Sequence, residues 1–335
     1  MLRKPAEPKP PPRPAVPPRP ARPRVGGRRT TALLWLFGLV FIGIAVLRVL
    51  GVDGPPVLVS ALALTPYLVL AGLLLFLIAF AVRRRVLAFA VLLMTLSIAV
   101  LLVPRMVGDS QPEARGDHLR VLSASLNAGR VDPAAVVRLV REQRVDVLTL
   151  PELTEEALAG LDAAGLATEL PNRVLDTLPG GNGSGIAARF PLRKIVLVEP
   201  DVRAQTSAVV DLPGQADVEV LAVHVVPISE GDADRWRAEL GALPKPFPER
   251  VRVLAGDFAA TFDHAAFRRI LDPGFVDAAE QAGKGLLPTW VSAPFGPPAT
   301  RDHILADQRC AISDYAVHDL PGGDHEAVLS EIVLP

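Results

Sequence analysis

Residues 253–267 read VLAGDFAATFDHAAF, an apolar run followed by a tight turn and the start of a helical pattern. The run up to Ala255 is typical of a buried strand, and Asp257 stands at its end. A carboxylate at a strand end can be aimed into a cleft at much lower cost than one inside the sheet. Taken alone, Asp257 is best interpreted as a solvated turn residue, and the alternative is a functional acid on a rigid sheet, close to Ala259, whose methyl group offers no chemistry.

Outward from this stretch, residues 117–335 alternate short β-rich runs with a few helical segments. Many strands interleaved with few helices favour two sheets packed face to face with helices outside, over a doubly wound sheet that would alternate strictly. The expected fold class is therefore α/β. We expect strands at 119–127, 144–153, 184–190, 194–200, 207–213, 218–226, 250–258, 301–307, 311–320 and 326–334, and helices at 133–143, 155–165, 232–243 and 264–271.

The chain before this domain has a different composition. Residues 1–30 carry nine Lys or Arg, one acid and a dense run of prolines, which predicts a disordered Pro/Arg-rich tail. The next residues are almost wholly apolar, in runs close to the ~20 residues needed to cross a bilayer core. One alternative is that these runs are buried helices of a soluble protein, which would require three consecutive helices that are wholly apolar. The other is a cleavable signal peptide, which is disfavoured because the first apolar run begins only after thirty residues. We expect a membrane anchor over 31–103, with three transmembrane helices at about 31–50, 56–82 and 86–103, and a polar linker at 104–116.

Basic residues orient this anchor. The tail and the run Arg83, Arg84 and Arg85 belong in the cytoplasm by the positive-inside rule. Three spans put the two chain ends on opposite sides, so the expected location is the cell membrane, multi-pass, with a cytoplasmic N-terminus and an extracellular domain over 117–335. The apolar runs contain no carboxylate or histidine, which favours an anchor over a channel or transporter.

Charge separates the two halves. Residues 1–116 hold 15 Lys or Arg against 4 Asp or Glu, a net charge of +11, while 117–335 hold 20 against 32, a net charge of −12. Proteins that grip duplex nucleic acid normally present a basic face to the phosphates. The acidic domain therefore argues against tight DNA binding. The single cysteine, Cys310, excludes an internal disulfide.

Single polar residues lie at or just beyond the ends of the expected strands. Together they supply oxygen ligands for a hard cation and histidines paired with carboxylates for acid/base work. That combination suits cleavage of a phosphate ester, in which a cation and a histidine stabilise charge while a carboxylate orients water. The residues are Asn127, Glu152, His224, Asp257, Asp302 with His303, and Asp324 with His325.

These motifs resemble the endonuclease/exonuclease/phosphatase (DNase I-like) superfamily over about 119–334, in the form of a bacterial membrane-anchored member. Each motif is weak alone, but their order and spacing are specific. The resemblance implies a four-layer α/β sandwich of two packed mixed β-sheets flanked by helices, and Mg²⁺ as the cofactor, with Mn²⁺ or Ca²⁺ as alternatives. The motifs are LRVLSASLN, VDVLTLPEL, SGIAARFPL, VLAVHVVP, VLAGDFAAT, PTW, RDHIL and GGDHEAV.

The resemblance also implies roles. Glu152 would be the principal Mg²⁺ ligand, with Asn127 and Asp324 beside it. Asp257 would orient or deprotonate the attacking water. The remaining catalytic residues would be His325, which contacts the scissile phosphate, Asp302, which holds the ring of His325, and His224 on the opposite side of the phosphate.

The resemblance assigns no role to the four remaining histidines. His303 follows Asp302 on a strand and points either into the core or into the cleft. His118, His264 and His318 fall outside the motifs and are expected at the surface.

The sequence departs from the family pattern at three positions. The usual GDFNAT is GDFAAT here, so Ala259 replaces an asparagine whose amide would hold the phosphate or the water. Losing one such donor typically costs about 10²–10³ in turnover. Thr261 or an ordered water could substitute. Pro151 and Arg301 stand where glutamine and an apolar residue are usual.

The leading hypothesis is a membrane-anchored, Mg²⁺-dependent phosphoesterase that hydrolyses a phosphodiester or phosphomonoester outside the cell, slowed by Ala259. The alternative is a catalytically impaired domain that binds a phosphorylated ligand as a sensor. Tethering at the lipid bilayer favours a lipid head group or small phosphate ester as substrate, with nucleic acid a weak possibility. No particular protein partner is indicated.

Overall fold

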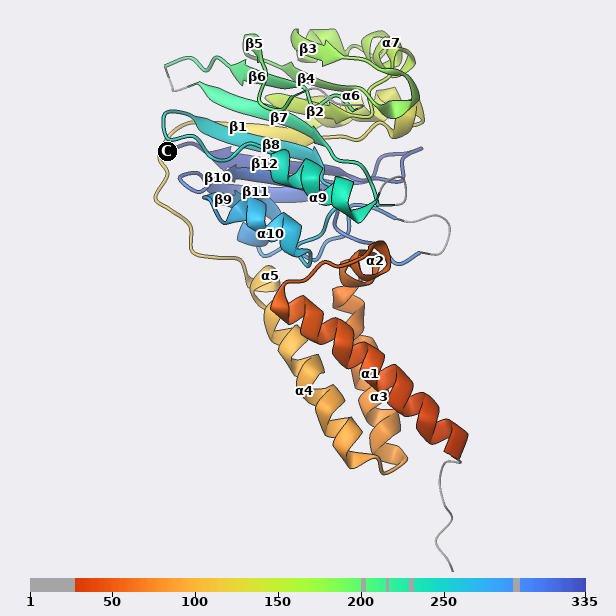
Figure 1. The fold of residues 1–335 in the computed structure, drawn as a ribbon. Helices are drawn as coiled ribbons and strands as arrows, with labels where there is room; N and C mark the ends of the chain where they lie inside the picture. The colour runs from red at the N-terminus through yellow and green to blue at the C-terminus, as the bar shows by residue number, and fades with distance from the viewer. Residues whose placement is uncertain (1–27, 200–202, 215–216, 229–231, 292–295) are drawn as a thin grey trace, which may run out of the picture.

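The computed structural model describes residues 28–199, 203–214, 217–228, 232–291 and 296–335. The tail predicted at 1–30 lies almost wholly outside the described residues. Figure 1 shows a bundle of helices that leads into a domain built on two sheets.

Each sheet has six strands and mixes parallel with antiparallel pairs. The first has the order β11-β12-β1-β2-β4-β3, and the second β5-β6-β7-β8-β10-β9. Only the β1–β2 and β7–β8 pairs are parallel among the described strands. The first sheet comprises β1 (His118–Ser123), β2 (Val147–Pro151), β3 (Asn172–Asp176), β4 (Ser184–Ala188), β11 (Ala311–His318) and β12 (Ala327–Val333); the second comprises β5 (Leu192–Ile195), β6 (Ser207–Val210), β7 (Val218–His224), β8 (Val251–Asp257), β9 (Phe275–Asp277) and β10 (Asp302–Asp307).

Helices cover the outer face of each sheet. Successive strand residues point to opposite faces, so Val253 packs between the sheets while Leu254 packs against the outer helices. In the first sheet, Val121 likewise packs between the sheets and Leu122 packs against the outer helices. The predicted sandwich of two mixed sheets flanked by helices is confirmed. The helices are α6 (Pro133–Glu142), α7 (Glu155–Ala163) and α8 (Leu166–Glu169) on the first sheet, and α9 (Ala233–Ala242) and α10 (Ala265–Leu271) on the second, with α11 (Ala278–Gln281) after β9.

Local signals account for several helix starts. Asp132 accepts a hydrogen bond from the backbone of Ala134 at the start of α6, and Thr154 accepts one from Ala157 at the start of α7. Two strands, β3 and β9, are absent from the predicted set because neither contains an apolar run long enough to indicate a strand. β3 reads NRVLD, with half-exposed and charged residues, and β9 has only three residues.

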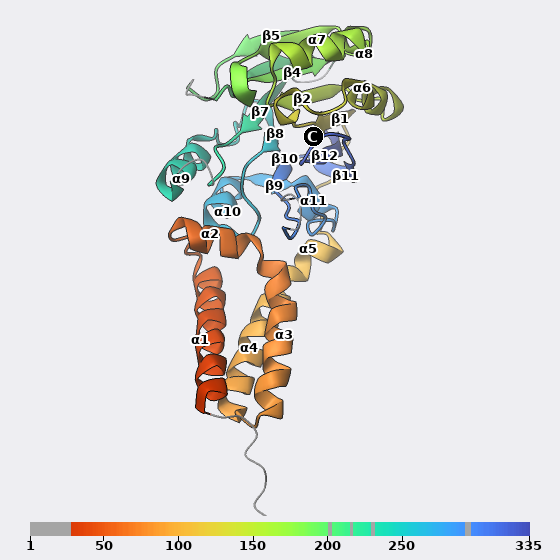
Figure 2. The same cartoon turned by 90° about the vertical axis from the view of Figure 1, so that its right-hand side faces the viewer.

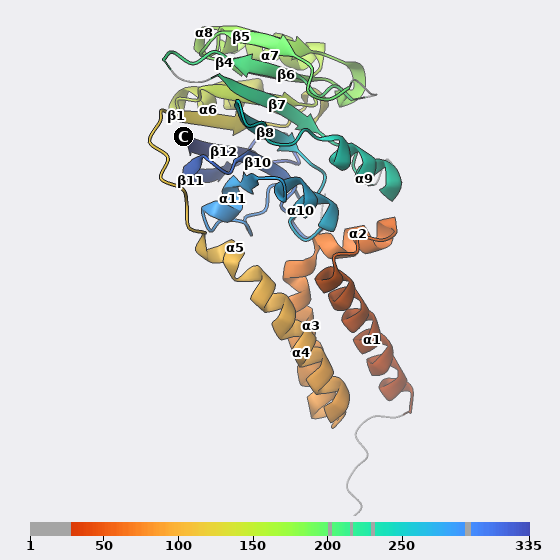
Figure 3. The same cartoon turned by 60° about the vertical axis from the view of Figure 1, so that its left-hand side comes forward.

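The apolar segment forms α1 (Arg28–Leu50), α2 (Pro56–Ala63), α3 (Thr65–Ala81), α4 (Arg85–Leu102) and the short α5 (Pro104–Val107). Figures 2 and 3 show α1, α3 and α4 side by side, with α2 lying across one end of the bundle beneath the two-sheet domain. The loop between α3 and α4 lies at the other end.

Among the described residues, two helices are long and apolar enough to cross a membrane, Arg29–Leu50 and Arg85–Val107. The span expected at 56–82 is not one straight helix, because α2 and α3 meet at 81°. Pro66 is the second residue of α3, and a proline cannot donate the hydrogen bond that would continue α2. A third span exists only if this bent pair counts as one, so three transmembrane helices remain a prediction.

The helical segment is joined to the domain by buried charges. Asp263 accepts hydrogen bonds from Arg48 of α1 and Arg105 of α5, each at 2.8 Å. Arg105 also donates to Glu280 of α11 at 2.7 Å. Asp263 is 1% exposed and Arg105 2%. These contacts tie both ends of the apolar segment to the residues that follow β8.

Asp53 and α2 add polar contacts to this junction. The carboxylate of Asp53 accepts from the backbone of Ala265 and Ala266, so it caps the free N–H groups at the start of α10. His264 Nε2 lies 2.8 Å from the carbonyl oxygen of Val59 in α2. The expectation that His264 lies at the surface is therefore wrong, because α2 covers it.

Asp263→Ala should destabilise the full-length protein by about 3–5 kcal/mol, because it removes the carboxylate partner of the buried Arg48 and one of the two carboxylate partners of the buried Arg105. The measurement is the unfolding midpoint of the detergent-solubilised protein. Glu113→Ala is the control, since Glu113 pairs with Arg115 in an exposed bridge whose loss should change little. Equal midpoints for the two variants would contradict the assigned role of Asp263.

Candidate active site

Three neighbouring strands align three of the predicted catalytic residues. His224 at the end of β7 is the direct neighbour of Asp257 on β8, and Asp302 at the start of β10 is its neighbour on the other side. A Cβ at Gly256 would lie 2.0 Å from the carbonyl oxygen of Val223, so only glycine permits the close approach just before Asp257. All three catalytic side chains are buried.

His325 completes the group from the loop before β12. Its Nδ1 lies 2.8 Å from Asp302 Oδ2, and its Nε2 lies 3.8 Å from Asp257 Oδ2. The Thr289 hydroxyl donates to Asp302 Oδ2 at 2.8 Å, while the backbone N–H of Asp302 donates to the same hydroxyl. Asp302 therefore holds the ring of His325, as predicted, and the other ring nitrogen faces Asp257.

The two carboxylates set the charge of His325. Burial by itself lowers the pKa of this imidazole, but the charges of Asp302 and Asp257 outweigh burial and raise the pKa to about 9. His325 is thus an imidazolium at neutral pH and can donate a hydrogen bond from Nε2.

Asp257 is held in its ionised form. Burial raises the pKa of its carboxyl, but the nearby charges of Arg301 and His325 outweigh burial and lower it below the ordinary value. Oδ1 accepts a hydrogen bond from the backbone of Ala259 at 2.7 Å, and Oδ2 accepts one from Arg301 at 3.2 Å. The site therefore pairs a carboxylate with a protonated histidine.

His224 carries no charge. Burial, followed by the charge of Arg203, lowers its pKa to about 3. Arginine can only donate, so the contact with the Arg203 guanidinium makes Nε2 the acceptor and leaves the proton on Nδ1. That Nδ1 is buried without a hydrogen-bond partner among the described residues. It is a free donor beside Asp257.

Two predicted metal ligands share this site. Burial raises the pKa of Glu152, the charge of His325 opposes that shift, and the charges of Asp257 and Asp324 add to it. Ser125 donates to Glu152 Oε1 at 3.1 Å. Asp324 Oδ1 is buried with no partner in the part of the chain that the structure describes. Glu152 and Asp324 thus lie near the catalytic pair with carboxylate oxygens to spare.

Asn127 is placed less favourably for a ligand. Its amide nitrogen donates to the carbonyl of Gly322 at 3.3 Å, which sets it against the loop that carries Asp324. Its amide oxygen, however, accepts from the side chain of Arg130. A ligand role for Asn127 would require Arg130 to release that oxygen, and it stays a prediction.

Backbone strain concentrates at the same residues. Asn127, Glu152 and Ala259 have φ values of +48°, +60° and +49°, in the left-handed region that disfavours most side chains. Strain of this kind gathers at functional sites, where the surrounding structure enforces it. Asparagine tolerates this conformation better than alanine does. The family's asparagine would therefore suit the backbone at position 259 better than the residue present.

A divalent cation fits this set of residues. The ligand atoms of Asp257, Asp302 and His325 lie within 4.8 Å of one another, and this buried cluster could hold a metal. Asp302 is already occupied by His325 and Thr289, however, whereas Asp324 Oδ1 has no partner among the described residues and Glu152 accepts from the Ser125 hydroxyl at Oε1. Carboxylate oxygens with few donors are the ligands that hard cations prefer.

His303 and Thr261 both make structural contacts. His303 contacts Asp277 at 2.6 Å and the carbonyl of Ala260 at 2.9 Å, so it points into the core. The Thr261 hydroxyl accepts from the backbone of Asp263 and so stabilises the turn before α10. Its substitution for the missing asparagine amide stays a prediction, since Thr261 also lines a cavity together with Ala259.

Arg301 is the site residue that sequence reasoning undervalued. Its guanidinium bonds to Asp257, stacks on the ring of Trp290 at 4.6 Å, and keeps Nε buried without a partner among the described residues. The only signal in the sequence was an arginine where an apolar residue is usual. The structure thus brings a fixed positive charge next to Ala259.

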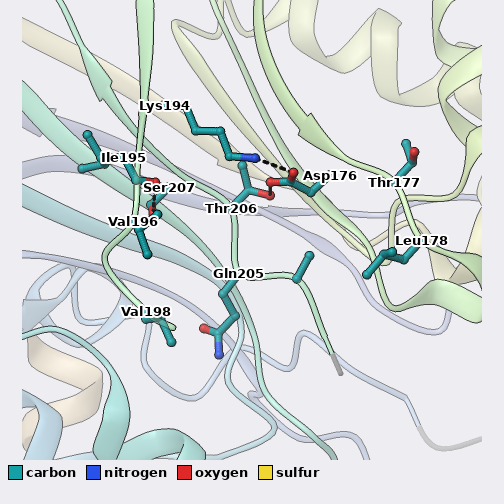
Figure 4. Close-up of a pocket in the computed structure, with 11 residues that line it drawn as sticks. Asp176, Thr177, Leu178, Lys194, Ile195, Val196, Val198, Gln205, Thr206 and Ser207 are labelled. Atoms are coloured by element: carbon teal, nitrogen blue, oxygen red, sulfur yellow. Dashed lines mark hydrogen bonds and ion pairs between the residues drawn. The ribbon is translucent and has the colours of Figure 1, made fainter. Parts of the chain in front are cut away.

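A separate cavity of about 280 Å³ lies between β3 and the β5–β6 edge. Figure 4 shows Lys194 pointing at Asp176 across it, and Thr206 also donates to Asp176. These polar groups satisfy one another, which leaves no charge for a ligand.

Two mixed sheets flanked by helices, with an Asp, His and Asp cluster at their strand ends, define a fold and site of the phosphoesterase type. The model of the endonuclease/exonuclease/phosphatase family matches residues 122–325. The chain belongs to this family. No curated protein matches the sequence.

Solved structures share the fold. An endonuclease/exonuclease/phosphatase from Beutenbergia cavernae is 18% identical, with a TM-score of 0.52 over 65% of this chain and 72% of its own. A homologue from Bacteroides vulgatus is 16% identical, with a TM-score of 0.53 over 65% of this chain and 100% of its own. TDP2 from D. rerio, solved with a single-strand DNA product, is 16% identical, with a TM-score of 0.52 over 64% of this chain and 99% of its own.

The ring of His325 should titrate near pH 9 in the metal-free protein, compared with the ordinary value of about 6.5. Because the folded pKa is raised, the stability that this group contributes is complete below about pH 6.5 and is lost as pH rises through about 9. Imidazole NMR in EDTA checks the titration. Asp302→Asn removes the carboxylate charge that raises the pKa of His325 most, so the titration midpoint of the ring should fall. A midpoint near 6.5 in the wild type would refute the assignment.

Proposed function

We propose that the protein is a membrane-anchored, Mg²⁺-dependent phosphoesterase whose domain acts outside the cell. The observation that carries the proposal is the pair of ionised Asp257 and protonated His325, set 3.8 Å apart beside Glu152 and Asp324. Membership of the endonuclease/exonuclease/phosphatase family supports the same reaction class. Mn²⁺ and Ca²⁺ are alternative ions for the same oxygen ligands.

Each residue of the site has a distinct role in the proposed hydrolysis. Glu152 and Asp324 would hold the cation, which supplies charge neutralisation for the phosphoryl oxygens when it is bound. Asp257 accepts the proton of the attacking water, because its carboxylate is ionised and buried. His325 and His224 donate hydrogen bonds to the phosphoryl oxygens from the two sides of Asp257.

Arg301 alters the consequence of Ala259. A methyl group cannot hold a phosphate, but the guanidinium beside it can bind one through two parallel hydrogen bonds. The same guanidinium pairs with Asp257 and so weakens it as a base. We therefore propose a slow enzyme in which Arg301 takes over phosphate binding.

A second candidate function is a sensor that binds a phosphorylated ligand without turnover. Ala259 and the ion pair between Arg301 and Asp257 favour it, because both reduce catalysis and leave an anion site intact.

The placement of the basic loop supports the proposed topology. Arg83, Arg84 and Arg85 lie at the end of the bundle farthest from the two-sheet domain (Figure 2). If that loop is cytoplasmic, the domain lies on the outer side. The acidic charge of residues 117–335 favours a lipid head group or small phosphate ester over nucleic acid as the substrate.

The full-length protein in detergent should hydrolyse bis(p-nitrophenyl) phosphate with Mg²⁺ and stop in EDTA. Asp257→Ala and Glu152→Ala should each lower turnover by about 10²–10⁴, as expected for loss of a general base or of a metal ligand. Asp314→Ala, at an exposed position, is the control. Absence of metal-dependent turnover at high protein concentration would leave only the sensor.

Ala259→Asn should raise turnover, because it restores an amide donor and suits the left-handed backbone. Arg301→Gln should lower turnover in the wild-type background by about 10-fold or more and have a smaller effect in Ala259→Asn, since the two groups would then share one task. Steady-state kinetics are measured on the wild type, the two single variants and the double variant, which together form a double-mutant cycle. Additive effects would show that Arg301 does not compensate for Ala259.

A further inference from the structure

A cavity of about 450 Å³ lies between the anchor and the catalytic residues. Its volume falls within the range of about 300–1,000 Å³ that is usual for ligand sites. Helix α2 contributes Val59, Ser60 and Ala63 to one wall. The domain contributes Ala259, Trp290 and Arg301 to the wall that adjoins the catalytic group. The cavity is thus built jointly by the anchor and the active site.

The two ends of this cavity differ in chemistry. On the α2 side, Val59, Ala63 and Leu64 supply apolar surface beside the hydroxyl of Ser60, and the ring of Trp290 is also apolar. Arg301 brings a cation whose Nε is unpaired among the described residues. Arg301 also bonds to Asp257, so the charged end lies next to the catalytic group. This arrangement complements an amphiphile with an anionic group at Arg301 and an apolar body along α2.

Ala259 fits the same interpretation. It lines the cavity, so its methyl group adds apolar surface where an asparagine would add a further polar group to those of Thr261, His264 and Arg301. The anion-binding task falls to Arg301.

The position of α2 identifies the source of such a ligand. This helix lies across the end of the apolar bundle, and its Val57 is 82% exposed. Helix α3 continues from α2 into the bundle after the 81° bend. An apolar chain that leaves a bilayer around the bundle would meet α2 first.

We propose that this cavity holds the apolar chain of a membrane-resident phosphate ester, with its phosphate at Arg301 and the catalytic residues. The inference rests on the proposed function for the reaction, and on the cavity alone for the binding of the chain.

A kinetic test compares two diesters that share the reacting group, ethyl p-nitrophenyl phosphate and dodecyl p-nitrophenyl phosphate, with full-length protein in lipid nanodiscs. Ser60→Phe fills the cavity from an exposed position on α2 that touches no catalytic residue. It should lower kcat/KM for the dodecyl ester by about 10-fold or more and leave the ethyl ester within about two-fold. Val57→Phe, at an exposed position of the same helix that does not line the cavity, should change neither.

Partitioning into the bilayer raises the rate with the dodecyl ester in every variant. The ratio between variants for one substrate therefore decides the test. Equal losses for both esters in Ser60→Phe, or no loss for either, would overturn the chain-binding role. If the wild type hydrolyses neither ester, the proposed enzymatic function fails, and the chain site is decided by binding.

Binding is measured in EDTA with a dodecyl phosphate brominated on its chain, which quenches tryptophan fluorescence on contact. Trp35→Phe removes the tryptophan of α1; Trp290 then lines the cavity directly, while the fully buried Trp236 lies behind the cavity wall against Ala259 and His264. Saturable quenching of Trp290 that Ser60→Phe abolishes and Val57→Phe preserves would support the site. Quenching that is unaltered by Ser60→Phe, or absent from the wild type, would refute it.

Discussion

The pairing of β8 with β7 on one side and with β10 on the other is the constraint on which the site depends. These hydrogen-bonded ladders place His224, Asp257 and Asp302 in one row. His325 then reaches Asp302 and faces Asp257. A slip of one residue in either ladder would turn its side chains to the opposite face of the sheet. The packed core between the two sheets prevents that slip, because it requires the alternate residues of each strand to point inward.

The segment after β8 serves two parts of the molecule. Asp257, the last residue of β8, belongs to the candidate catalytic group, while Asp263 and His264 in the segment that follows lie buried against the helices that precede the domain. The same short turn also lines the cavity beside α2. The conformation of the site residues is therefore coupled to the apolar helices through the short segment that follows β8. This connection gives the apolar segment a structural role at the active site beyond attachment.

Much of the site could be predicted because strand ends leave a clear trace in sequence. Glu152, Asp257 and Asp302 follow or begin apolar runs, and the chain order of the motifs indicated the family. Arg301 was missed as a functional group because its importance comes from Trp290 and Asp257, which are distant in sequence. His264 was misplaced for the same reason, since its cover is supplied by Val59, 205 residues earlier. The bend in the 56–82 segment was overlooked although Pro66 signalled it.

The sequence by itself determined the two-sheet class, the apolar helical segment and the acid at the end of β8, because these depend on local periodicity and composition. Only the tertiary structure decided which polar residues meet. It paired His325 with Asp302, turned His303 into the core and set Arg301 beside Ala259. The physical reason is that burial and electrostatic contact depend on neighbours across the fold, and side chains far apart in sequence supply them.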